Sequence, residues 1–113
     1  MRPIVFIAGR LRHADPRQMA ANVLTARHYA MEIAKLGCAP YCPHAAIGFA
    51  FRAIPEADAN ATNNTFLFLA HALFALPYAE RSLGARRELK VAVQRGLPVF
   101  HRLEDLQAWR RSQ

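Results

Sequence analysis

The stretch PYAERSLGARRELKVAVQRG, from Pro77 to Gly96, predicts a turn followed by a helix. Ser82 is a good N-cap, because its hydroxyl can accept a hydrogen bond from an early helical N–H. Gly96 suits the position just after a helix, and Pro98 prevents the helix from continuing. We therefore expect a helix from Ser82 to Arg95, preceded by a turn that could grasp a phosphate group.

The apolar residues of this helix fall on one face when successive residues are placed 100° apart. They are Ala85, Leu89, Ala92 and Val93, with Val91 at the far edge. Glu88 falls between Val91 and Ala92 on this apolar side, and no neighbour three or four positions away is cationic. An inward carboxylate near a helix N-terminus costs energy unless it is hydrogen-bonded or functional. Two interpretations stay open: a functional carboxylate, or one paired with another part of the chain.

Short apolar runs alternate with helix-forming segments along the rest of the chain. Strands are expected over Pro3–Ala8, Ala39–Cys42, Leu73–Leu76 and Leu97–Phe100, and helices over Arg17–Leu36, Asn60–Ala70 and Leu103–Arg110. The first run is almost continuously apolar, which suits a parallel strand covered on both faces. Strands that alternate with helices imply βαβ units, so we expect an α/β fold with a mainly parallel sheet. The 113 residues form a single domain, 1–113.

Residues with binding potential follow the first two predicted strands. Gly9 comes directly after the first strand, where glycine lets the backbone approach a ligand closely, and Arg10 and Arg12 suggest an anion. His44 follows the second strand, at what should be the same edge of the sheet. Ligands of open α/β sheets bind outside the carboxyl ends of the strands, so His44 is a pocket candidate. The alternatives are solvated loop arginines and a structural histidine.

Two other segments complete the interpretation. Residues 45–59 show no clear period, and Phe49, Phe51 and Pro55 suggest a loop folded over the pocket. Asn22 is one position away from the apolar stripe of the first helix and is expected to be a helix-surface amide.

The charge of the chain is unusual. Fifteen Lys and Arg residues face eight Asp and Glu residues, a formal net charge of +7. Thirteen of the fifteen are Arg, which suits bidentate binding of phosphate or carboxylate. Nucleic-acid binding stays open but is disfavoured, because no basic block exceeds two residues and no aromatic residues are interleaved with basic ones.

Cysteine spacing and hydropathy bear on the compartment. In an extended segment Cys38 and Cys42 lie about 13 Å apart, too far for a disulfide, and two sulfurs alone are weak evidence for zinc. We expect buried free thiols in a reducing cytoplasm, and no metal or cofactor. The apolar run at the N-terminus is too short for a signal peptide, and residues 66–76 are too few to span a membrane.

Several short motifs, in this order, resemble one family. They are IVFIAG near the start, Asn22, CPH at Cys42–His44, LP-x-x-ERS-x-G-x-R-x-E at Leu76–Glu88, and GLPVF at Gly96–Phe100. From about Pro3 to Arg102 the chain resembles the nucleoside 2-deoxyribosyltransferase-like superfamily, in particular its small phage and bacterial members of unassigned function. The resemblance implies a flavodoxin-like or Rossmann-like three-layer sandwich with a four- to five-stranded, mainly parallel sheet. It also implies cleavage or transfer at the N-glycosidic bond of a deoxynucleoside or its 5′-monophosphate.

The resemblance assigns roles to individual residues. Glu88 matches the glutamate that attacks the anomeric carbon and forms a covalent glycosyl intermediate, which water or another base resolves. Ser82 matches a serine that helps to hold the 5′-phosphate, and Gly84 belongs to the same motif. The Gly9–Arg10 loop matches a loop that contacts the same end of the substrate, and His44 and Asn63 complete the expected binding residues. Family members are commonly homodimers or larger, with a neighbouring chain completing the site.

The chain departs from the family pattern at several positions. Asn63 and His71 stand where aspartates are common, Tyr78-Ala79 replaces Gly-Trp, Ala59 replaces a Trp, and Arg10 replaces a Pro. Asn63 cannot protonate a departing base, which removes the expected general acid, and His71 should lie at the start of a strand, outside the pocket. Three hypotheses stay open. The chain is an active N-glycosidase or deoxyribosyltransferase, a weak or inactive relative that binds or sequesters a nucleotide or nucleotide-derived signal, or a basic protein that binds nucleic acid or a partner.

Overall fold

The sheet in the computed structural model, which describes residues 1–46 and 53–113, has four parallel strands in the order β2-β1-β3-β4. The strands are β1 (Ile4–Ala8), β2 (Ala39–Tyr41), β3 (Ala72–Ala75) and β4 (Val99–Phe100). Residues 5–8 of β1 are fully buried, as the continuous apolar run predicts for a strand covered on both faces. The predicted α/β class and parallel sheet are confirmed.

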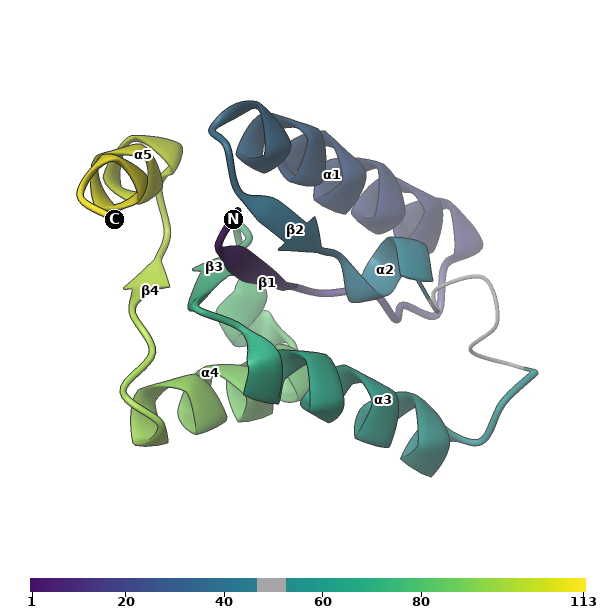
Figure 1. Cartoon of the computed structure of the whole chain (residues 1–113). Helices are drawn as coiled ribbons and strands as arrows, with labels where there is room; N and C mark the ends of the chain where they lie inside the picture. Colours follow the sequence, from purple (N-terminus) through teal and green to yellow (C-terminus); the bar gives the residue numbers. More distant parts are fainter. Residues whose placement is uncertain (47–52) are drawn as a thin grey trace.

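Helices cover both faces of this sheet (Figure 1). They are α1 (Pro16–Lys35), α2 (Pro43–Ala46), α3 (Glu56–Leu69), α4 (Leu83–Gln94) and α5 (Leu103–Arg111), with a short 3₁₀ turn, η1, at Ala79–Arg81. Val5 and Ile7 pack in one core cluster with residues of α1 and α5, whereas Phe6 and Ala8 pack in another with residues of α3 and α4. Alternate residues of one strand thus supply the two halves of a three-layer, flavodoxin-like sandwich.

Capping contacts set the two helices that the sequence marks most clearly. The Asp15 carboxylate accepts a hydrogen bond from the Arg17 amide at 2.9 Å, and the Ser82 hydroxyl accepts one from the Ala85 amide at 3.2 Å. Ser82 therefore acts as the predicted N-cap of α4, and Asp15 acts as the N-cap of α1. These two contacts also fix where α1 and α4 begin relative to the ends of the strands.

The interpretation of residues 45–59 as one loop is wrong for its last part. Helix α3 begins at Glu56 rather than Asn60, and Glu56 and Asp58 place negative charge in its first turn, where the helix dipole favours it. Pro55, which precedes the helix, is exposed. Phe49 and Phe51, the other two residues of the expected cover, lie outside the described residues.

Other local predictions need smaller corrections. The side chain of Val93 is 68% exposed, because α4 packs on the sheet through Ala85 and Ala92 and the next position turns toward solvent. The 3₁₀ turn η1 and the short helix α2 were not expected, and β2 and β4 are shorter than predicted. Cys38 and Cys42 are buried and are not joined in a disulfide, as expected. In the part of the chain that the structure describes, no helix is both long and apolar enough to cross a membrane.

Candidate functional site

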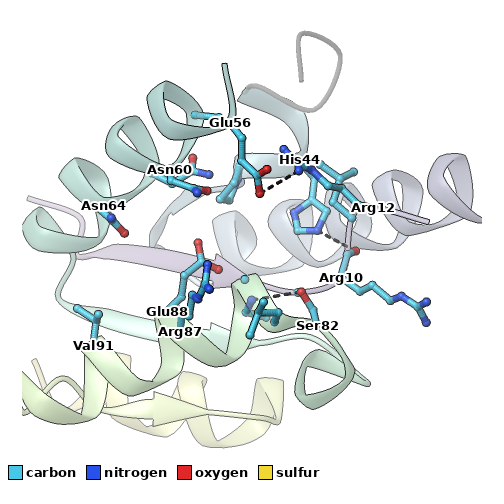
Figure 2. A pocket seen from close by; sticks show the side chains of 18 of the residues that line it. Arg10, Arg12, His44, Glu56, Asn60, Asn64, Ser82, Arg87, Glu88 and Val91 are labelled. Atoms are coloured by element: carbon cyan, nitrogen blue, oxygen red, sulfur yellow. Dashed lines mark hydrogen bonds and ion pairs between the residues drawn. The ribbon is translucent and has the colours of Figure 1, made fainter. Parts of the chain in front are cut away.

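A cavity of about 640 Å³ lies at the carboxyl edge of the sheet (Figure 2). Its walls come from the loop after β1, from α2, from α3 and from the first three turns of α4. The structure brings together on these walls all the residues that the sequence singled out for the site: Gly9, Arg10, His44, Asn63, Ser82, Gly84 and Glu88. They come from four segments that are far apart in the chain.

The carboxylate of Glu88 projects from α4 into this cavity (Figure 2). The side chain is partly buried, and it makes no hydrogen bond or ion pair with any residue in the ranges 1–46 and 53–113. Burial raises the pKa of Glu88 to about 8. The interpretation of Glu88 as half of a structural ion pair thus finds no support among the described residues.

The first turn of α4 presents backbone donors to the same cavity. Ser82 uses its hydroxyl to cap the Ala85 amide and its carbonyl to accept from the Arg86 amide. The amides of Leu83 and Gly84 have no acceptor in the described structure, as is usual for the start of a helix. Such an N-terminus favours anions, and Arg81 also lines the cavity here.

Gly9 has a packing role in addition to its place in the wall. A Cβ atom at this position would lie only 2.9 Å from the Cβ of Leu76, so any side chain would push the loop away from β3. Beyond Gly9, the Arg12 guanidinium forms a 3.0 Å ion pair with Glu56 at the start of α3. The loop after β1 is therefore tied to β3 and to α3.

His44 is 3% exposed, and its Nε2 atom lies 3.0 Å from the carbonyl oxygen of Arg10. Burial lowers the pKa of His44, against the opposing effect of the Arg10 and Gly9 carbonyls, so the ring is neutral at neutral pH. A carbonyl only accepts, and Nε2 must therefore carry the proton. The Nδ1 atom is buried and has no partner among the described residues.

Asn22 differs from the expected surface amide. Its side chain is partly buried, and its Nδ2 donates to the carbonyl of Leu11 at 3.1 Å, while its Oδ1 accepts from Gln18 at 2.9 Å. The sequence gives no local sign of this contact, because the loop and the helix meet only in the folded chain.

Helix α3 lines the cavity with amides. The Oδ1 atom of Asn63 accepts a hydrogen bond from the Tyr41 hydroxyl at 3.2 Å, and Asn60 and Asn64 lie on the same wall (Figure 2). Burial raises the pKa of Tyr41, and the neighbouring Cys42 and Glu88 raise it further, so the phenol lies within electrostatic reach of the carboxylate. Sequence reasoning missed Asn60 and Tyr41, although Asn60 lies one helical turn before Asn63.

His71 lies outside the cavity, as expected for the residue just before β3. Its backbone donates to the Ile4 carbonyl at 2.8 Å, and its Nδ1 accepts from the Ile4 amide at 2.9 Å. His71 thus aligns β3 with β1, which is a structural role.

Among residues 1–46 and 53–113, no three His, Cys, Asp or Glu side chains gather closely enough to hold a metal ion. No protein-family model matches the sequence, and no curated protein matches it. The functional argument therefore depends on the chemistry of the cavity.

Proposed function

We propose that the protein cleaves, or transfers the sugar at, the N-glycosidic bond of a deoxynucleoside or its 5′-monophosphate, with Glu88 as the nucleophile. One observation carries this proposal: the Glu88 carboxylate forms no ion pair with any described residue. It lies on the wall of a cavity that has cationic groups and unpaired helical amides at one end. Desolvating such a group without a partner is unfavourable, which favours a role in chemistry over a role in stability.

The proposed reaction has two displacements at one carbon. A carboxylate oxygen of Glu88 bonds to the anomeric carbon as the carbon–nitrogen bond breaks, and the base leaves with the bonding electron pair and takes a proton from water. Water then attacks the same carbon, the ester bond to Glu88 breaks, and the carboxylate is restored with release of a proton. A second base in place of water gives transfer, and in both cases the configuration at the sugar is retained.

The raised pKa of Glu88 is compatible with this role. The anomeric carbon gains positive charge in the transition state, and a carboxylate in a partly dry site stabilises that charge more strongly than one in water. With a pKa of about 8, only about one tenth of the free protein carries ionised Glu88 at pH 7. We therefore expect base release to increase as the pH rises toward 8.

The end of the cavity at the start of α4 suits the 5′-phosphate. The unpaired amides of Leu83 and Gly84, together with Arg10 and Arg81, provide hydrogen-bond donors and positive charge. Glu88 is six residues after Ser82, about 9 Å along the helix axis at 1.5 Å per residue, so one nucleotide could contact both. We further propose a cytoplasmic homodimer or larger homo-oligomer.

A second candidate function is nucleotide binding without rapid turnover. The observation that favours it is Asn63, whose amide is held by Tyr41 and has no acidic proton for a departing base. Glu56, another carboxylate of the cavity, is paired with Arg12. A protein of this kind would bind or sequester a nucleotide or a nucleotide-derived signal.

The deciding experiment is chromatography of base release from a panel of deoxynucleosides and their 5′-monophosphates, with Glu88→Ala as the control. Release that disappears in the variant supports the glycosidase or transferase. Saturable thermal stabilisation by a 5′-monophosphate without release supports the binding protein. If neither effect is seen and binding to random DNA depends steeply on salt, the basic nucleic-acid-binding alternative is favoured.

A further inference from the structure

Two consecutive carbonyl groups of the loop after β1 are held by side chains from other elements. The Arg10 carbonyl accepts from His44 on α2, and the Leu11 carbonyl accepts from Asn22 on α1. The loop lines the cavity directly, so these contacts determine which polar groups of its backbone face a ligand.

The contact from His44 has a fixed direction. Its ring is almost fully buried, and its neutral form must place the proton on Nε2, because the Arg10 carbonyl only accepts. The contact from Asn22 is fixed as well. Gln18 donates to Oδ1 of Asn22, which leaves Nδ2 as the atom that faces the Leu11 carbonyl.

The geometry of the peptide bond links the contact from His44 to the orientation of the Leu11 amide. In a trans peptide the carbonyl and the following N–H point in opposite directions, so the Leu11 N–H points away from His44. His44 follows β2, and β1 lies between β2 and β3, the strand that leads to α4. The Leu11 N–H therefore points away from the β2 side of the sheet edge, where His44 lies. It makes no hydrogen bond with any residue that the structure describes.

We propose that His44 and Asn22 are positioning residues, which hold two loop carbonyls away from the α4 side of the cavity and direct the Leu11 amide at the 5′-phosphate of the substrate. The phosphate then contacts donors from both sides, Leu11 from the loop and the first amides of α4. This inference rests on the proposed binding of a nucleotide. It extends that proposal to two residues that touch the loop and not the phosphate.

The test compares the affinities of a deoxynucleoside 5′-monophosphate and of its parent deoxynucleoside by titration calorimetry. His44→Leu removes the donor to Arg10, and His44→Gln keeps a donor near the position of Nε2. Asn22→Leu removes the second contact independently. His101→Leu is the matched control, because His101 is exposed and outside the cavity lining.

We expect His44→Leu and Asn22→Leu each to weaken 5′-monophosphate binding about ten- to hundredfold, the effect of losing one hydrogen bond to a charged group. In Asn22→Leu, whose side chain is outside the cavity lining, nucleoside affinity should change less than about threefold, on the same scale, and His44→Gln should recover most of the 5′-monophosphate affinity that His44→Leu loses. Equal weakening of both ligands, or no rescue by His44→Gln, would overturn the inference. If His44→Leu does not fold, Asn22→Leu and His44→Gln decide.

Measurements of base release and ligand affinity on the wild-type protein distinguish a failure of this inference from a failure of the proposed function. If it releases base or binds nucleosides but gains no affinity from the 5′-phosphate, the positioning role is wrong and the glycosidic chemistry survives. If it binds the 5′-monophosphate through these residues but never releases base, the chemistry is wrong and the positioning role survives. If it binds neither ligand, both are refuted.

Discussion

Replacing Glu88 with Gln should stabilise the protein, and the gain should grow with pH. The raised pKa means that the folded protein holds the Glu88 proton more tightly than the unfolded chain does. Unfolding therefore releases this proton at any pH between the ordinary value of 4.5 and about 8, and the free energy of unfolding of the wild type falls as the pH rises through that window. The Glu88→Gln variant has no ionisable group at this position, so its free energy of unfolding does not decrease for this reason.

The size of the effect follows from the pKa values. At 1.36 kcal/mol per pH unit, the difference between 4.5 and about 8 sets an upper limit of about 5 kcal/mol. Because the Glu88 side chain keeps contact with water, we expect a measured gain of about 2 kcal/mol at pH 8 and above, and almost none near pH 4.5.

The assay is urea unfolding of both proteins at pH 5, 7 and 9, followed by the fluorescence of Trp109. With a urea dependence of about 1–2 kcal/mol per molar, the midpoint of the variant should exceed that of the wild type by about 1–2 M at pH 9. Other titrating groups are shared, so they cancel in the difference at each pH. A difference that stays constant from pH 5 to 9 would show that Glu88 is already ionised in the folded protein, and it would refute the reasoning.

Four further outcomes test the site. If Glu88 reacts as a carboxylate, kcat/KM for base release should rise about tenfold per pH unit up to pH 8 and then level off, and a flat profile from pH 6 to 9 would argue against it. Asn63→Asp should increase base release by supplying an acid, because its carboxyl group can still accept from Tyr41, and an unchanged rate would mean that the role given to this position is wrong. Gly84→Ala should raise the melting temperature slightly, since a Cβ there meets nothing closer than the Ser82 hydroxyl at 3.9 Å. The same variant should bind a 5′-monophosphate more weakly, and unchanged affinity in calorimetry would place the phosphate elsewhere. Gly9→Ala should destabilise the fold by about 1–3 kcal/mol in urea unfolding because of the contact with Leu76, and a neutral result would show that the loop can move away from β3.

Local signals in the sequence were enough for the elements that depend on neighbouring residues. Asp15 and Ser82 were recognisable as N-caps because a cap bonds to an amide two or three residues ahead. The apolar run at β1 indicated a strand covered on both faces, and alternation with helices indicated the parallel sheet. Parallel topology in turn predicted that the segments after the first two strands meet at one edge, and Gly9 and His44 both line the cavity there.

One backbone position shows where local reasoning was incomplete. Tyr78 adopts the left-handed conformation, with φ of 65°, at the position where the resembled family has Gly. A non-glycine residue there is strained, and backbone hydrogen bonds hold the turn: the Ala79 amide donates to the Leu76 carbonyl at 3.1 Å, and the Arg81 amide donates to the Tyr78 carbonyl at 3.0 Å. The Arg81 guanidinium, 4.6 Å above the Tyr78 ring, covers the side chain that glycine would lack.

The tertiary structure alone decided the contacts between distant segments. Asn22 looked like a surface amide because its partner, the Leu11 carbonyl, comes from a loop whose path the helix pattern does not contain. Val93 fitted the apolar stripe by its angle, but the sheet covers only part of that stripe. The pKa of Glu88 likewise depends on how much of the carboxylate the surrounding elements remove from water. Short-range bonding and periodicity are enough to predict the elements and the edge where they meet. The chemistry of the cavity, by contrast, depends on burial and on hydrogen-bond partners, and these exist only in the folded arrangement.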